Sequence, residues 1–109
     1  MNMEFRINSN NIEILNFIFR KHLQIERVII YGSRAKGNFR ENSDVDLIIT
    51  NSKIDRHDIG KILSEIDDSN FSYIVDLQDF NTINNRDLID HINRVGKTIY
   101  SHIKYILQV

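Results

Sequence analysis

Two aspartates, Asp44 and Asp46, stand one residue apart at the start of an apolar run that ends at Thr50. Side chains alternate between the two faces of a β-strand, so residues two apart project in the same direction. A strand here brings both carboxylates to one face, where like charge raises one pKa unless a cation lies between them. Mg²⁺ prefers oxygen ligands and takes one or two carboxylates, with water and substrate phosphates completing its shell. The pair therefore predicts a magnesium site.

Taken alone, such a pair also fits a solvated strand end at which two aspartates flank a turn. A third carboxylate, Asp76, favours the metal site, because it lies inside another apolar run, residues 72–77, where a charge is costly unless it is paired or metal-bound. If the two strands are neighbours, Asp76 completes a three-carboxylate cluster. Such a cluster can hold two metal ions about 3.5–4 Å apart for an in-line phosphoryl displacement. Asp79 competes for this role but falls beyond the apolar alternation, so Asp76 is preferred.

A glycine–serine turn precedes the acidic pair. Gly32 directly follows an apolar run, and glycine permits a positive φ and close approach of a ligand to the backbone. Ser33 supplies a hydroxyl, the N–H groups of the turn can cradle a phosphate, and Arg34, Lys36 and Arg40 add positive charge. A plain turn capped by Ser33 explains the same residues, and the spacing fits neither a Walker A loop nor a dinucleotide fingerprint. Together with the carboxylates, the turn indicates a site for a metal-bound nucleoside triphosphate.

The elements that must position these residues follow from hydrophobic periodicity and turn signals. We expect a helix from Ser9 or Asn10 to about Leu23, a strand at 27–31, a short helical turn at 33–36, a polar loop at 38–43, a strand at 45–50, a helix at 55–66, a turn at 67–70, a strand at 71–77, a helix at 85–95 and a short strand at 97–100. The tail to Val109 is ambiguous between strand and helix. This order indicates an α/β (α+β) fold with a mixed β-sheet and flanking helices. The 109 residues suffice for one domain, 1–109, with its own core.

Composition narrows the functional classes. A formal net charge of −1 gives no support for general affinity for nucleic acid or anionic membranes. The absence of cysteine excludes disulfides, thiolate metal sites and a cysteine nucleophile. No apolar run approaches a membrane span and no signal-peptide apolar region is present, so a cytoplasmic location is expected. The four histidines lack metal-ligand spacing and are expected at the surface or at helix ends, and the tyrosines are expected to pack.

The order Gly32-Ser33, ten intervening residues, Asp44-Val45-Asp46 resembles the signature of the polymerase-β-like nucleotidyltransferase superfamily. The fuller string GSRAKG…SDVDLII resembles the minimal nucleotidyltransferases, or MNT proteins, of prokaryotes, with the match strongest over residues 27–79. The resemblance implies the polymerase-β-like nucleotidyltransferase fold.

The resemblance also implies roles for individual residues. Asp44 and Asp46 would coordinate the catalytic and the nucleotide-bound Mg²⁺ ions. Asp76 would help to bind the catalytic metal and would assist deprotonation of the acceptor hydroxyl. Many relatives carry arginine at the position of Lys36, where lysine keeps the charge but loses the bidentate fork. The nucleotide contacts implied by the resemblance come from Gly32, Ser33, Arg34 and Lys36.

The partner is likewise implied by the resemblance. Short MNT proteins commonly pair with a small helical HEPN protein, often a toxic ribonuclease, and characterised members transfer AMP from ATP to a tyrosine of that toxin. Two alternatives stay open: a small-molecule nucleotidyltransferase, whose relatives generally have an additional acceptor-binding domain, and an antitoxin that acts by binding and occlusion without catalysis. A nucleic-acid polymerase or ligase is least supported, because the sequence contains no aromatic–basic stretch that would bind a strand.

Overall fold

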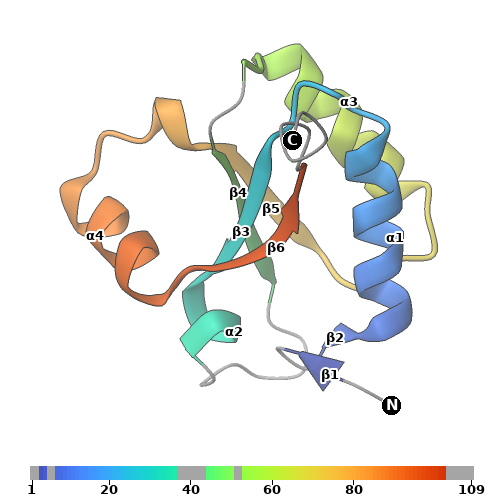
Figure 1. The fold of residues 1–109 in the computed structure, drawn as a ribbon, viewed down its shortest axis with the longest axis horizontal. Coiled ribbons are helices and arrows are strands. Elements are labelled where there is room, and N and C mark those ends of the chain that lie inside the picture. Colours follow the sequence, from blue (N-terminus) through green and yellow to red (C-terminus); the bar gives the residue numbers. More distant parts are fainter. Residues whose placement is uncertain (1–2, 5–6, 37–43, 51–52, 103–109) are drawn as a thin grey trace, which may run out of the picture.

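The computed structural model describes residues 3–4, 7–36, 44–50 and 53–102 (Figure 1). The elements are β1 Met3–Glu4, β2 Ile7–Asn8, α1 Ser9–Arg20, β3 Arg27–Tyr31, α2 Gly32–Lys36, β4 Val45–Thr50, α3 Arg56–Asp67, β5 Val75–Asp79, the 3₁₀ turn η1 Phe80–Thr82, α4 Arg86–Val95 and β6 Lys97–Ser101. The expected α/β fold is confirmed. The predicted polar loop at 38–43 and the tail from residue 103 lie outside the described residues.

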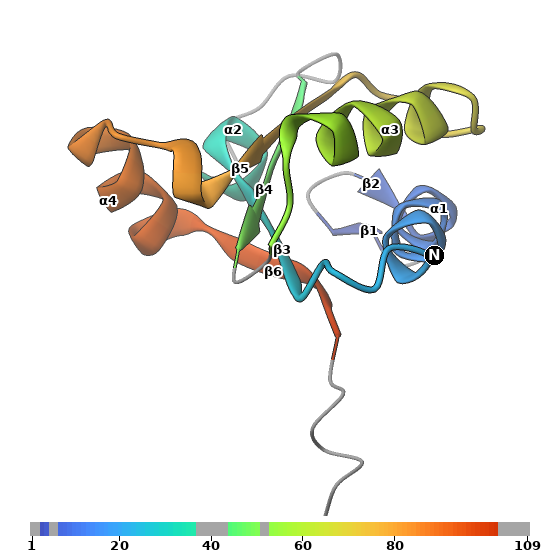
Figure 2. The same cartoon turned by 90° about the horizontal axis from the view of Figure 1, so that it is seen from above.

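The central sheet is mixed. Within the described residues it has four strands in the order β5–β4–β3–β6, with β3 antiparallel to both β4 and β6 and with β4 parallel to β5. Figure 2 shows α1 and α3 on one side of this sheet and α4 on the other. The sheet is therefore covered on both faces, and each strand side chain points toward one helical layer or the other.

The helices begin at polar caps, as their sequences dictate. Asn8 caps α1 and accepts a hydrogen bond of 2.9 Å from the Asn11 N–H, one residue before the expected Ser9 or Asn10. Asp55 and Asp58 form a reciprocal capping box at the start of α3. Because the caps satisfy backbone N–H groups left free at helix ends, they set where each helix starts.

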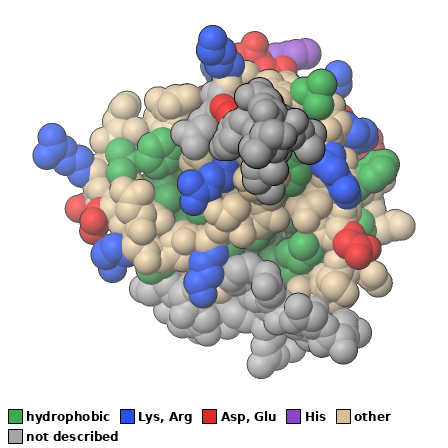
Figure 3. Space-filling view, viewed as in Figure 1, with side chains coloured by type: hydrophobic (Ala, Val, Ile, Leu, Met, Phe, Trp, Pro, Cys, Tyr) green, Lys and Arg blue, Asp and Glu red, His purple; other side chains and the backbone are tan. Residues whose placement is uncertain are grey.

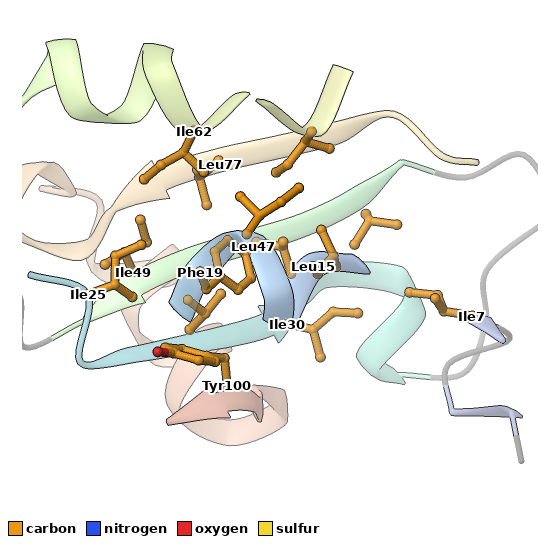
Figure 4. Close-up of a cluster of buried hydrophobic side chains, with 14 residues drawn as sticks. Ile7, Leu15, Phe19, Ile25, Ile30, Leu47, Ile49, Ile62, Leu77 and Tyr100 are labelled. Carbon is orange, nitrogen blue, oxygen red and sulfur yellow. The ribbon is translucent and has the colours of Figure 1, made fainter. Parts of the chain in front are cut away.

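The main core lies between the sheet and the layer formed by α1 and α3 (Figure 4). Its strand members include Val45, Leu47 and Ile49 of β4, which are fully buried. A smaller cluster of Tyr31, Ile48 and Ile92 lies under α4. The alternation of β4 is thus observed directly, because its odd-numbered residues face α1 and α3 whereas Ile48 faces α4.

The strand that the sequence predicts at 71–77 begins and ends later in the structure, because β5 runs from Val75 to Asp79. Phe71 and Tyr73 pack against the core edge before the strand begins, and the Ser72 N–H donates a hydrogen bond to Asn11 on α1. Pairing with β4 extends through Asp79, so a tertiary partner prolongs the strand beyond its apolar run. The β1–β2 pair and η1 were not predicted.

None of the helices formed by the described residues is long and apolar enough to cross a membrane. On the face shown in Figure 3, the described Lys and Arg side chains are spread over the surface and stand apart from one another. This distribution agrees with the near-zero net charge of −1.

Candidate active site

The two strands that carry the predicted acids are adjacent and parallel. Their register pairs Asp46 of β4 with Asp76 of β5, whereas Asp79 pairs with Ile49. Asp46 lies between two core residues of the α1–α3 side, so alternation directs its side chain toward the α4 side. Asp44, two residues earlier in the chain, is exposed. The sequence predicts that Asp46 and Asp76 come together if their strands are neighbours. The two strands are neighbours, and the fold aligns these two residues.

The pKa of Asp46 depends on its burial and on the charged residues around it. Burial raises the pKa of Asp46 above its ordinary value, and the charges of Asp76 and Asp44 raise it further, while His91 lowers it. Asp76 and Asp44 are therefore both within electrostatic reach of Asp46. Repulsion between them is the condition that a bound cation relieves.

The donor set fits a nucleotide-borne Mg²⁺. Among the residues that the structure describes, no three side chains of His, Cys, Asp or Glu are arranged to hold a metal ion, so the three-carboxylate cluster stays a prediction. Mg²⁺ does not require such a cage, since one or two carboxylates plus substrate phosphates usually suffice. Asp46 and Asp76 are register partners, and the charge of Asp76 raises the pKa of Asp46, so the two carboxylates could hold an ion of this kind.

Tyr31 lies beside the acids at the end of β3. It pairs with Asp46 in the antiparallel register and is 5% exposed. Burial raises the pKa of Tyr31 to about 12, with further contributions from the negative charges of Asp76 and Asp46. The Gln78 side chain donates a hydrogen bond of 3.3 Å to the Tyr31 hydroxyl. Tyr31 therefore forms a neutral, buried wall next to the carboxylates.

The Gly32 turn lies against Asp46. Gly32 has a φ of +76°, a conformation that side chains with a Cβ rarely adopt. A Cβ atom added there would collide with the Asp46 carboxylate. The positive φ thus favours glycine, and an added Cβ would also force the Asp46 carboxylate to shift. The side chains of Ser33 and Lys36, predicted to contact phosphates, lie outside the described part of the structure.

Arg34 is buried, unlike an arginine that contacts a phosphate at the protein surface. Its side chain is 1% exposed, and its guanidinium lies 4.6 Å from the centre of the Tyr73 ring. A buried cation–π contact of this kind joins α2 to the segment before β5. Its proposed contact with the nucleotide stays a prediction.

One residue of the site was missed from the sequence. His91 of α4 accepts a hydrogen bond of 3.2 Å from the Gly32 N–H through Nε2, and its ring packs edge-on against Tyr31 at 6.4 Å. The expectation of a surface or helix-end histidine is wrong here. His91 follows Leu88 by three residues and precedes Ile92, both of which pack toward the sheet, so helical spacing was the signal that placed it inward.

His22 lies just past the end of α1, in agreement with the expectation of a surface or helix-end histidine. Its side chain is buried, and Nε2 lies 3.0 Å from Glu65 Oε1 on α3. This contact joins the end of α1 to α3, on the side of the sheet away from the acids. Nearby, a surface hollow of about 1140 Å³ between α1 and the end of α3 contains none of the predicted site residues.

The mixed sheet, the aligned carboxylates on adjacent strands and the positive-φ glycine turn agree with the fold that the sequence resemblance implies. The family described as "Polymerase beta, Nucleotidyltransferase" matches residues 13–104, which is most of the chain. The chain belongs to this family. No curated protein matches the sequence.

Solved structures agree at the level of the fold. A crystal structure of a toxin–antitoxin with AMP-PNP aligns with a TM-score of 0.66 at 20% identity, covering 90% of this chain and 77% of that one. A putative nucleotidyltransferase from Sulfolobus solfataricus aligns with a TM-score of 0.58 at 18% identity, covering 93% and 86%. A tri-AMPylated Shewanella oneidensis HEPN toxin in complex with an MNT antitoxin aligns with a TM-score of 0.56 at 17% identity, covering 88% and 74%.

Proposed function

We propose that this protein is a Mg²⁺-dependent nucleotidyltransferase that transfers AMP from ATP to a tyrosine of a partner HEPN toxin, and that it acts as the antitoxin of the pair. The observation that carries the proposal is the alignment of Asp46 with Asp76 beside the Gly32 turn. The structural relatives named above, an antitoxin complex with a nucleotide analogue and one with an AMPylated HEPN toxin, support this choice within the family.

Each of the predicted site residues has a role in this transfer of AMP. Asp44, Asp46 and Asp76 would hold one or two Mg²⁺ ions, which neutralise the phosphate charge when bound. Gly32, lacking a Cβ, lets a phosphate approach the backbone, and Ser33 offers it a hydroxyl. The acceptor oxygen forms a bond to the α-phosphorus while the bond from that phosphorus to the bridging oxygen breaks, and pyrophosphate leaves. Asp76 takes the proton from the acceptor hydroxyl.

The acceptor is best supplied from outside the chain. Tyr31 is the hydroxyl beside the acids, but it is buried and the pKa of about 12 disfavours its ionised form. Tyr100 is also buried, and its pKa is raised by that burial. Transfer requires the acceptor to be aligned in line with the α-phosphate, and positioning supplies much of the rate. A tyrosine presented by a bound partner meets this need.

Intact mass spectrometry tests the proposal. The protein is incubated with a HEPN partner, ATP and Mg²⁺, and both chains are then weighed. We expect one or more AMP units on the partner with the wild-type protein and none with Asp46→Asn. Asp79→Asn is the matched control, because Asp79 lies on the same strand but pairs with Ile49, and it should retain transfer. An unmodified partner that Asp46→Asn still neutralises would contradict catalysis and support occlusion.

A further inference from the structure

We infer that His91 is a positioning residue of the nucleotide site: it holds the Gly32 amide, and so fixes the turn from which α2 presents its first N–H groups beside Asp46. The inference rests on the proposed function, because it assigns His91 a part in binding the nucleotide phosphates. It adds a residue from α4 to a site otherwise built from β3, α2, β4 and β5.

The hydrogen bond lies where the strand pairing ends. Tyr31 is the last residue of β3 paired with β4, and the pairing of β3 with β6 ends at Ile30. The next N–H, that of Gly32, is directed to His91 Nε2 at 3.2 Å. A half-buried backbone N–H that lacked this acceptor would be costly. The bond requires that Nε2 be unprotonated, with the ring proton on Nδ1.

The imidazole is held firmly enough to act as a fixed acceptor. Its ring meets the Tyr31 ring edge-on, with centres 6.4 Å apart and an angle of 77° between the planes. Ile92, the next residue of α4, is 3% exposed and packs with Tyr31 and Ile48. The backbone of α4 is thereby anchored to the sheet directly beside His91.

The peptide that His91 holds controls two parts of the site. The φ of +76° at Gly32 sets the direction in which the chain enters α2. The same residue lies so close to the Asp46 carboxylate that an added Cβ would displace this carboxylate. A turn that relaxes would shift the α2 amides relative to that carboxylate. A displacement of about 1 Å between groups that must act together can reduce a rate by about a hundredfold.

The test compares two substitutions of His91. His91→Leu removes the acceptor, whereas His91→Gln places an amide oxygen near the position of Nε2. His57→Leu is the control, because His57 is exposed on the first turn of α3. For each variant, the Kd for ATP with Mg²⁺ and the kcat and KM of AMP transfer are measured, together with the NMR shift of the Gly32 amide proton without nucleotide.

We expect His91→Leu to raise the Kd and KM at least about tenfold and to move the Gly32 amide shift upfield. His91→Gln should restore most of the affinity and of the shift, and His57→Leu should match the wild type. Nucleotide affinity unchanged in His91→Leu, or equal losses in the Leu and Gln variants, would overturn the inference while leaving the proposed function intact. A wild-type protein that binds no ATP would overturn the proposed function and this inference with it.

Discussion

Asp46 on β4 and Asp76 on β5 are register partners in a parallel strand pair. The register thus places two carboxylates side by side, and the charge of Asp76 contributes to the raised pKa of Asp46. Like charges on adjacent strands are destabilising. We therefore expect the Asp46–Asp76 pair to serve the proposed transfer at some expense of stability, and unfolding and transfer assays measure these two effects separately.

Asp46→Asn should raise the free energy of unfolding in EDTA at neutral pH by about 0.2–1 kcal/mol, because it removes one member of the like-charge pair. It should also abolish nucleotide transfer, because an amide is a poor Mg²⁺ ligand beside a phosphate. Urea unfolding and the mass-spectrometric transfer assay measure the two effects. Marked destabilisation by Asp46→Asn would indicate a structural role for this carboxylate.

The increase in the free energy of unfolding that we expect from Asp46→Asn should depend on pH. The pKa of Asp46 is raised in the folded protein above the ordinary value of 3.8, so the folded state binds the proton more tightly than the unfolded state does. The contribution of Asp46 to wild-type stability is consequently lost as the pH rises from its ordinary pKa through its higher pKa in the folded protein. The advantage of Asp46→Asn should be complete above the folded pKa and should vanish below about pH 3, where both states are protonated. A constant difference across this range would contradict the raised pKa.

Gly32→Ala should destabilise the protein by about 1–2 kcal/mol through the left-handed backbone alone, with a further loss from the contact with the Asp46 carboxylate. Transfer should fall with it. Gly60→Ala is the matched substitution, because Gly60 lies within α3 and an added Cβ would meet nothing within 4 Å. That variant should gain about 0.4–1 kcal/mol. Urea unfolding of both variants checks the contrast, and effects of the same sign would contradict it.

Tyr31 should ionise late in an alkaline titration. Its pKa of about 12, against an ordinary value of 10.0, means that the unfolded state loses this proton first, so its contribution to stability is lost as pH rises from about 10 to 12. Subtracting the phenolate absorbance of Tyr31→Phe from that of the wild type isolates this group, which matters because burial also raises the pKa of Tyr100. A difference signal centred near the ordinary value would show that Tyr31 is open to water.

ATP should raise the melting temperature strongly with Mg²⁺ and weakly without it, since the phosphates complete the metal shell. At an ATP concentration one hundred times the Kd, the expected stabilisation is about 2.7 kcal/mol. Ser33→Ala should reduce this shift by removing the hydroxyl that we propose as a phosphate contact. Thermal melts with and without EDTA provide the measurement. Equal stabilisation by ATP with and without Mg²⁺ would argue against binding of the triphosphate through a metal ion.

The sequence by itself determined the local features of this protein. The period-two alternation of β4 assigned Asp46 to one face and Leu47 to the other, and helical periodicity located α3 and α4 within a residue or two. The succession of Gly32, Ser33 and the spaced aspartates was enough to indicate the family that the comparison confirms. These features depend on residues close together in the chain, so the sequence pattern contains them.

The tertiary structure alone decided which strands are neighbours and in which register. Asp46 and Asp76 are thirty residues apart in the chain, and only the parallel pairing of β4 with β5 aligns them. The same pairing carried β5 through Asp79. Other long-range contacts packed Arg34 on Tyr73 and brought His91 of α4 to Gly32. Periodicity tells which face of an element is buried. It does not tell what lies against that face, because that contact depends on the packing of segments distant in sequence.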